Sequence, residues 1–372
     1  MLPRRLLIAL VLLTASLHAA TAPRWTEQKA NQWYAQQPWL VGSDYIPANA
    51  INQLEMWQAA TFDPKQIDLE LGWAQAIGMN TMRVFLHDLL WQQDPVGFRN
   101  RIRTFLEICE RHHIRPIFVL FDSCWDPNPY LGPQHRPTPG IHNSGWVQSP
   151  GTAALEDPAQ IPRLETYVRG IVGAFANDKR ILAWDIWNEP DNEGGGNYDK
   201  LELPNKQQLV LALLPLAFAW ARGAHPSQHL TSGLWQGDWS AYEKLSPTAR
   251  VQLDDSDIVS FHNYGPPADF EKHVAWLRPS HRPLVCTEYM ARGLGSTFAA
   301  ILPIAKKEKI GAISWGFVAG KTQTYFPWDS WQHPYVDKPP LVWHHDIFHS
   351  DGTPYRPEEV ALIRRLTGRG TQ

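Results

Sequence analysis

Short apolar runs alternate with helix-like segments about eight times along this chain, and this rhythm constrains its fold more than any other feature. The expected strands cover residues 39–45, 80–88, 115–122, 180–187, 229–235, 257–264, 282–289 and 311–317. The main expected helices cover residues 63–77, 98–113, 161–176, 206–223, 269–277, 296–307 and 357–367. Such alternation predicts parallel strands joined by crossover helices. Eight units in about 350 residues fit an α/β fold of the (β/α)8 TIM barrel type, as a single domain, better than an open doubly wound sheet.

Residues 1–22 have the pattern of a secretory signal peptide. Arg4 and Arg5 supply the positive start, residues 6–13 supply an apolar run, and small residues follow it. The run is too short to predict a membrane span, so we expect a secreted or periplasmic protein without stable membrane insertion. The mature domain would then comprise residues 23–372.

Composition narrows the classes of partner. The net charge of −3 leaves no basic excess, which argues against a nucleic-acid partner. The 18 tryptophans exceed what core packing needs, and tryptophan faces suit sugar rings. Cys109, Cys124 and Cys286 form no C-x-x-C pair, so we expect three small buried residues and no disulfide framework. The sequence makes no prediction about oligomeric state.

Polar residues cluster where the predicted strands end. In a (β/α)8 barrel the active site lies at the C-terminal ends of the strands, so residues there are candidates for function. They are Arg83, His87, Asp88, Asp122, Asn188, Glu189, Trp235, His262, Asn263, Tyr264, Glu288, Tyr289 and Trp315. Glu189 and Glu288 end strands four and seven, which lie roughly opposite each other across the barrel mouth.

Two facing carboxyl groups suit glycoside hydrolysis, in which one acid protonates the leaving oxygen and the other attacks the sugar or activates water. The attacking carboxylate must stay ionised, and Arg83 and Tyr264 are the obvious groups to favour that form. We expect no cofactor and no metal. The His344-His345-Asp346 run lacks H-E-x-x-H spacing, and the G-x-S-x-G elbow of a serine hydrolase is missing from the sequence.

Several motifs together resemble one group of enzymes. They are Trp187-Asn188-Glu189-Pro190, Thr287-Glu288-Tyr289, Arg83, His262-Asn263-Tyr264 and Trp315. In order and spacing they resemble clan A glycoside hydrolases, the family 5-like retaining β-glycosidases. The resemblance implies that Glu189 is the acid/base and Glu288 the nucleophile. It further implies that Asn188 binds the sugar 2-hydroxyl and that Trp315 floors the −1 subsite, the site of the sugar whose bond is cleaved.

The end of strand three departs from this pattern. Many family 5 enzymes carry a histidine there, whereas this chain has Phe121-Asp122-Ser123-Cys124-Trp125. Asp122 and Trp125 are therefore candidates for substrate binding. His87, at the end of strand two, and Trp235, at the end of strand five, are further candidates.

The expected function is a secreted retaining glycoside hydrolase that acts on an oligo- or polysaccharide of glucan, mannan or xylan type. Endo and exo action both stay open, although long loops after strands three, four and eight could close one end of the cleft and favour short substrates. Two alternatives remain: a non-catalytic carbohydrate-binding barrel, and a metal-dependent hydrolase on the same fold.

Overall fold

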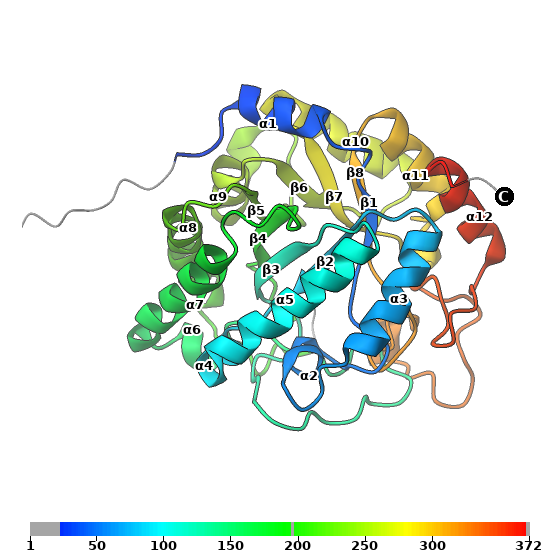
Figure 1. The fold of residues 1–372 in the computed structure, drawn as a ribbon, viewed down its shortest axis with the longest axis horizontal. Coiled ribbons are helices and arrows are strands. Elements are labelled where there is room, and N and C mark those ends of the chain that lie inside the picture. The colour runs from blue at the N-terminus through cyan, green and yellow to red at the C-terminus, as the bar shows by residue number, and fades with distance from the viewer. Residues whose placement is uncertain (1–22, 195–196, 370–372) are drawn as a thin grey trace, which may run out of the picture.

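Eight short strands form the centre of the molecule, a computed structural model that describes residues 23–194 and 197–369 (Figure 1). They are β1 (Val41–Asp44), β2 (Thr81–Phe85), β3 (Ile117–Asp122), β4 (Ala183–Asn188), β5 (His229–Thr231), β6 (Val259–His262), β7 (Leu284–Tyr289) and β8 (Gly311–Ser314). Paired neighbours run parallel in the order β5-β4-β3-β2-β1-β8-β7-β6. A parallel bridge from Leu234 to Phe261 joins the two ends. The sheet thus closes into the predicted (β/α)8 barrel.

Helices connect the strands and surround the barrel (Figure 1). They are α1 (Glu27–Ala35), α2 (Gln53–Trp57), α3 (Pro64–Ala76), α4 (Asp88–Gln93), α5 (Pro95–Arg111), α6 (Thr152–Leu155), α7 (Ile161–Ala174), α8 (Lys206–Gly223), α9 (Pro247–Asp255), α10 (Pro267–Leu277), α11 (Phe298–Lys307) and α12 (Pro357–Leu366). Asp63 caps α3 by accepting from two backbone N–H groups, and Gly78 follows the helix with φ of 82°. Helix α5 starts three residues earlier than predicted because Asp94 caps it and Pro95 occupies its first position.

The N-terminal helix closes one end of the barrel. Trp25 and Ala30 are buried against Leu40, Ile117 and Val285, near the starts of the strands. In Figure 1, α1 lies across this end, and the long loops that follow the strands gather at the other. The carboxyl ends of the strands are therefore the end at which a site can open.

Two sequence predictions differ from the structure. Strand five ends at Thr231 instead of residue 235, and beyond it Gln252 donates its side-chain N–H to the carbonyl oxygen of Gly233. Gln252 belongs to α9, a helix that the sequence analysis did not predict. Asp88, expected in strand two, is the first residue of α4 and accepts hydrogen bonds from Ser149 and Arg163.

The expected signal peptide, residues 1–22, lies outside the described residues. Among the helices that are described, none is both long and apolar enough to span a bilayer.

Candidate active site

Glu189 stands immediately after β4, where the buried strand gives way to a loop. Its φ of 42° lies in the left-handed region, which non-glycine residues rarely adopt. The Asn192 backbone N–H stabilises this turn by donating to the Glu189 carbonyl oxygen at 2.9 Å. Backbone strain of this kind persists where surrounding contacts enforce it, and it is common at functional sites.

Three side chains contact the Glu189 carboxyl group. Oε1 lies 2.9 Å from His262 Nδ1, and Oε2 accepts from Asn192 Nδ2 at 2.7 Å. The Cys124 Sγ lies 3.3 Å from Oε2. Burial raises the pKa of Glu189, although these donors oppose the rise.

Glu288 lies on β7, where the register with the neighbouring strands shifts near the end of the strand. Arg83 Nη1 donates to Oε1 at 2.8 Å, and the Tyr264 hydroxyl donates to Oε2 at 2.6 Å. Both contacts are those expected from the sequence. Burial raises the pKa of Glu288, while the charge of Arg83 and the tyrosine hydrogen bond act against it. Because only Glu288 contacts the arginine directly, a proton shared by the pair is more stable on Glu189.

The two carboxyl groups face each other around His262. One oxygen of each and a ring nitrogen of His262 lie within 4.8 Å of one another. Burial lowers the pKa of His262 to about 4, so its ring is neutral near pH 7. A neutral imidazole can donate from Nδ1 to an ionised Glu189 or accept from a protonated one.

Arg83 is fully buried at the centre of a charge cluster beneath the pair. Besides Glu288 it contacts Asp44 at 2.9 Å and Asp185 at 2.9 Å. Its Nη2 also donates to Asn188 Oδ1 at 2.6 Å. Since the guanidinium has a carboxylate or amide partner on each side, its orientation toward Glu288 is fixed.

Asp122 orients Asn188 and does not face the cavity. Its Oδ1 accepts from Asn188 Nδ2 at 3.0 Å and its Oδ2 from Trp146 Nε1 at 2.6 Å. Burial raises the pKa of Asp122 to about 6. His87 is also buried away from the cavity, where it caps α4.

A cavity of about 190 Å³ lies above the carboxyl pair. Its lining comprises Cys124, Trp125, His142, Asn188, Glu189, Asn192, Trp235, Tyr264, Glu288, Trp315 and Trp328. The structure therefore brings seven predicted residues to one cavity: Trp125, Asn188, Glu189, Trp235, Tyr264, Glu288 and Trp315. Arg83 and His262 contact these residues from behind, whereas His87 and Asp122 stay outside the lining.

The loops after β3 and β8 are joined along one side of this cavity. Asn143 N–H donates to the Thr322 carbonyl oxygen at 2.8 Å, and Gln323 Nε2 donates to the carbonyl oxygens of Thr138 and Ile141. The two loops also pack through aromatic rings. Trp125 stacks on Trp331 with centroids 5.7 Å apart, and Tyr198 from the loop after β4 meets Trp331 edge-on.

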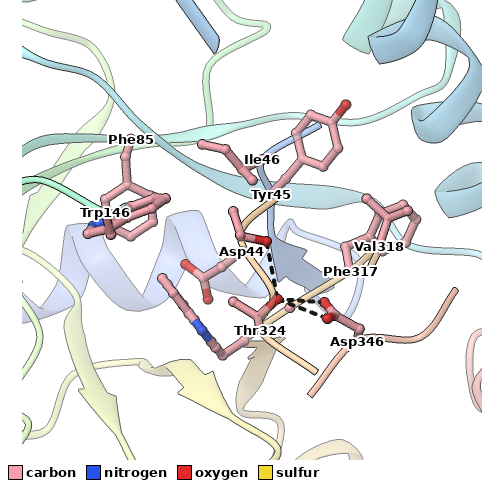
Figure 2. Close-up of a pocket in the computed structure, with 12 residues that line it drawn as sticks. Asp44, Tyr45, Ile46, Phe85, Trp146, Phe317, Val318, Thr324 and Asp346 are labelled. Carbon is pink, nitrogen blue, oxygen red and sulfur yellow. Dashed lines mark hydrogen bonds between the residues drawn. The ribbon is translucent and has the colours of Figure 1, made fainter. Parts of the chain in front are cut away.

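A second, smaller cavity lies on the other side of Trp315. Its volume of about 20 Å³ is enough for one water molecule. Figure 2 shows Thr324 and Asp346 facing each other at its polar end, with Asp44 nearby. The Asp44 Oδ2 atom has no hydrogen-bond partner within the part of the chain that is described.

The sequence model of the cellulase family, glycosyl hydrolase family 5, matches residues 140–333, just over half of the chain. The chain belongs to glycosyl hydrolase family 5. It is thus a member of a family of O-glycosyl hydrolases, as its sequence motifs indicate. A search among curated proteins found no match.

Similar solved structures share the fold of this family 5 protein. The exo-β-1,4-mannosidase of Opitutaceae bacterium strain TAV5 matches with a TM-score of 0.58 and 20% identity, over 89% of this chain and 60% of its own. The endo-1,4-β-mannanase of Rhizomucor miehei matches with a TM-score of 0.55 and 14% identity, over 88% of this chain and 97% of its own. The family 5 mannosidase of Rhizomucor miehei matches with a TM-score of 0.53 and 15% identity, over 90% of this chain and 93% of its own.

Sequence reasoning missed several side chains of this family 5 site. Asn192 and His142 lie in loops, where no strand period predicts their direction. Asp44 is a polar residue at the end of β1, so its position resembles that of the predicted residues, but it was overlooked. Cys124, expected to be a small buried apolar residue, instead lines the cavity beside Glu189.

The cluster of Glu189, His262 and Glu288 also has the geometry of three metal ligands. Both Glu288 oxygens and both Glu189 oxygens already have protein partners. The positive charge of Arg83 at 2.8 Å from Glu288 further disfavours a second cation there. These contacts favour carboxyl chemistry over metal chemistry.

Proposed function

We propose that this family 5 protein is a retaining β-glycosidase in which Glu189 is the acid/base and Glu288 the nucleophile. The separation of the two carboxyl groups carries this proposal. One oxygen of Glu189 lies within 4.8 Å of an oxygen of Glu288, which fits the about 5–5.5 Å carboxyl separation of retaining enzymes better than the about 6.5–9.5 Å of inverting ones. The short distance leaves Glu288 to attack the anomeric carbon directly.

The proposed first step uses both carboxyl groups. Glu288, ionised against Arg83 and Tyr264, attacks the anomeric carbon while Glu189 gives its proton to the leaving oxygen. The ionised Glu189 then takes a proton from water, whose oxygen displaces Glu288 and releases the sugar. The contacts of Glu189 with neutral His262 and with Asn192 suit this alternation, because they persist in both protonation states.

We further propose exo action on short β-linked oligosaccharides. The cavity of about 190 Å³ is smaller than the roughly 300–1,000 Å³ of sites that bury drug-sized ligands. The loops after β3 and β8 bond to each other, and we propose that they close the end of the cavity in which a sugar stacks on Trp315. Trp235 and the exposed residues 236–238 leave the opposite side open to a leaving group.

Among the open substrate types, β-mannosides come first. The similar structures named above are described as mannosidases and mannanases. Export across a membrane is also proposed, on the sequence of residues 1–22 alone.

The test is product analysis on β-linked manno-, gluco- and xylo-oligosaccharides and their polysaccharides, with and without EDTA. We expect a monosaccharide as the first product, fastest release from β-mannosides, and rates that EDTA does not change. A ladder of mixed oligomers from the start would contradict exo action. A loss of activity in EDTA that is restored by added metal would favour the metal-dependent alternative.

A further inference from the structure

Cys124 contacts the acid/base residue and has no role in the mechanism described above. Its Sγ lies 3.3 Å from Glu189 Oε2, within reach of an S–H···O hydrogen bond. The side chain also lines the cavity, so it borders the space that a substrate would occupy. The other two cysteines, Cys109 and Cys286, are fully buried in the core cluster.

The backbone around Cys124 is fastened to the segment that carries Glu189. Cys124 N–H donates to Asp122 Oδ1 at 3.0 Å. The neighbouring Ser123 donates from its backbone N–H to the Asn188 carbonyl oxygen at 3.2 Å and from its hydroxyl to the Pro190 carbonyl oxygen at 2.7 Å. Because these bonds reach the residues on both sides of Glu189, they fix the position of the thiol relative to the carboxyl group.

The environment keeps the sulfur protonated and oriented. Burial, followed by the nearby Glu189 and Asp122 carboxyls, raises the pKa of the Cys124 thiol. A protonated thiol can donate one hydrogen bond. Asn188 Nδ2 and Asn192 Nδ2 lie 3.4 and 3.6 Å from Sγ as donors, which leaves Glu189 as the acceptor of the S–H.

We propose, on the basis of the glycosidase function above, that Cys124 is a positioning residue that donates its S–H to Glu189 Oε2 and stabilises the ionised acid/base. Together with Asn192 it gives Oε2 two donors, while His262 faces Oε1. Hydrogen bonds to a carboxylate favour its ionised form. That form is the one that accepts a proton from water in the second half of the reaction.

Two substitutions at Cys124 separate this role from simple packing. Cys124→Ala removes the donor, and Cys124→Ser replaces it with a hydroxyl donor. The Glu189 pKa is measured by NMR titration of protein labelled with ¹³C-glutamate, and the Glu189 signal is assigned by its loss in Glu189→Gln. We expect Cys124→Ala to raise the Glu189 pKa by about half a pH unit. Cys124→Ser should keep the wild-type value or lower it. Cys109→Ala, the same change in the core, is the matched control and should leave the Glu189 pKa unchanged.

The same variants can be followed through activity. In the pH profile of kcat/KM, the limb at high pH reports loss of the proton on the acid. We expect this limb to move upward by about half a pH unit in Cys124→Ala and to return in Cys124→Ser. An unchanged Glu189 titration in Cys124→Ala, or a Cys124→Ser variant that behaves like Cys124→Ala, would overturn the role of the thiol. The NMR titration needs no turnover, so it decides this point even if the glycosidase proposal fails.

Discussion

At the scale of single residues, the two glutamates differ in what holds them. Glu288 has a buried cation and a hydroxyl as partners, whereas Glu189 has only neutral groups in direct contact. Desolvation acts on both, but only Glu288 has a full positive charge within hydrogen-bond distance. This asymmetry supports the proposed roles, in which Glu189 carries the proton and Glu288 the negative charge.

Substitution of each glutamate should therefore give a different kinetic result. Glu189→Ala is expected to slow substrates with poor leaving groups by about 10²–10⁴-fold and activated aryl glycosides far less. Glu288→Gly should abolish turnover of both, with added azide restoring some activity as a glycosyl azide of inverted configuration. Rates are measured with aryl glycosides of graded leaving-group acidity.

Glu193→Ala is the matched control, since Glu193 is an exposed glutamate in the same loop as Glu189. It should keep wild-type rates. If Glu189→Ala slowed every leaving group equally, the assignment of Glu189 as the acid would be wrong.

At the residue scale, the sequence predicts best those side chains that lie on strands or directly after them. Glu189 and Glu288 were chosen because a carboxyl group at the end of a buried strand is costly to bury, and Arg83 because it can favour the ionised form of a nearby carboxylate. Cys124 and Asn192 were missed because their direction depends on loop backbone such as the left-handed Glu189 and the left-handed Trp125. His87 was misplaced because a helix starts immediately after it and uses its ring as a cap.

At the scale of elements, the loop after β8 carries a buried carboxyl group of its own. Asp346 contacts the Thr324 hydroxyl and lies at the small cavity behind Trp315 (Figure 2). One hydroxyl can donate to only one carboxylate oxygen at a time, so Asp346 is poorly compensated when ionised. Burial raises the pKa of Asp346 to about 7.

This carboxyl group should make the stability of the protein depend on pH. Its folded-state pKa of about 7 exceeds the unfolded value of about 3.9, so its contribution is fully present below about pH 4 and is lost as the pH rises through about 7. Asp346→Asn cannot ionise. Relative to wild type, its Tm should therefore improve between pH 5 and pH 8, as thermal melts at each pH can show.

Asp337→Asn, an exposed change in the same loop, should show no such gain. A difference in Tm between Asp346→Asn and wild type that stays constant with pH would mean that Asp346 does not titrate in this range.

At the scale of the whole molecule, the barrel determines where the site lies. The helix α1 closes the end at which the strands begin, and the long loops border the cavity above the carboxyl pair at the other end. The strand–helix rhythm of the sequence was enough to predict this arrangement. It could not predict that the loops after β3 and β8 bond to each other, because those contacts join residues about 180 positions apart.

The configuration of the first product tests the central claim most directly. ¹H NMR of the wild-type reaction on an aryl β-glycoside that it cleaves records the released sugar before mutarotation. Because one oxygen of each carboxyl group lies within 4.8 Å of the other, the account predicts the β-anomer first, from double displacement at Glu288. Appearance of the α-anomer first would contradict the account, since it would require water, and not Glu288, to attack the sugar.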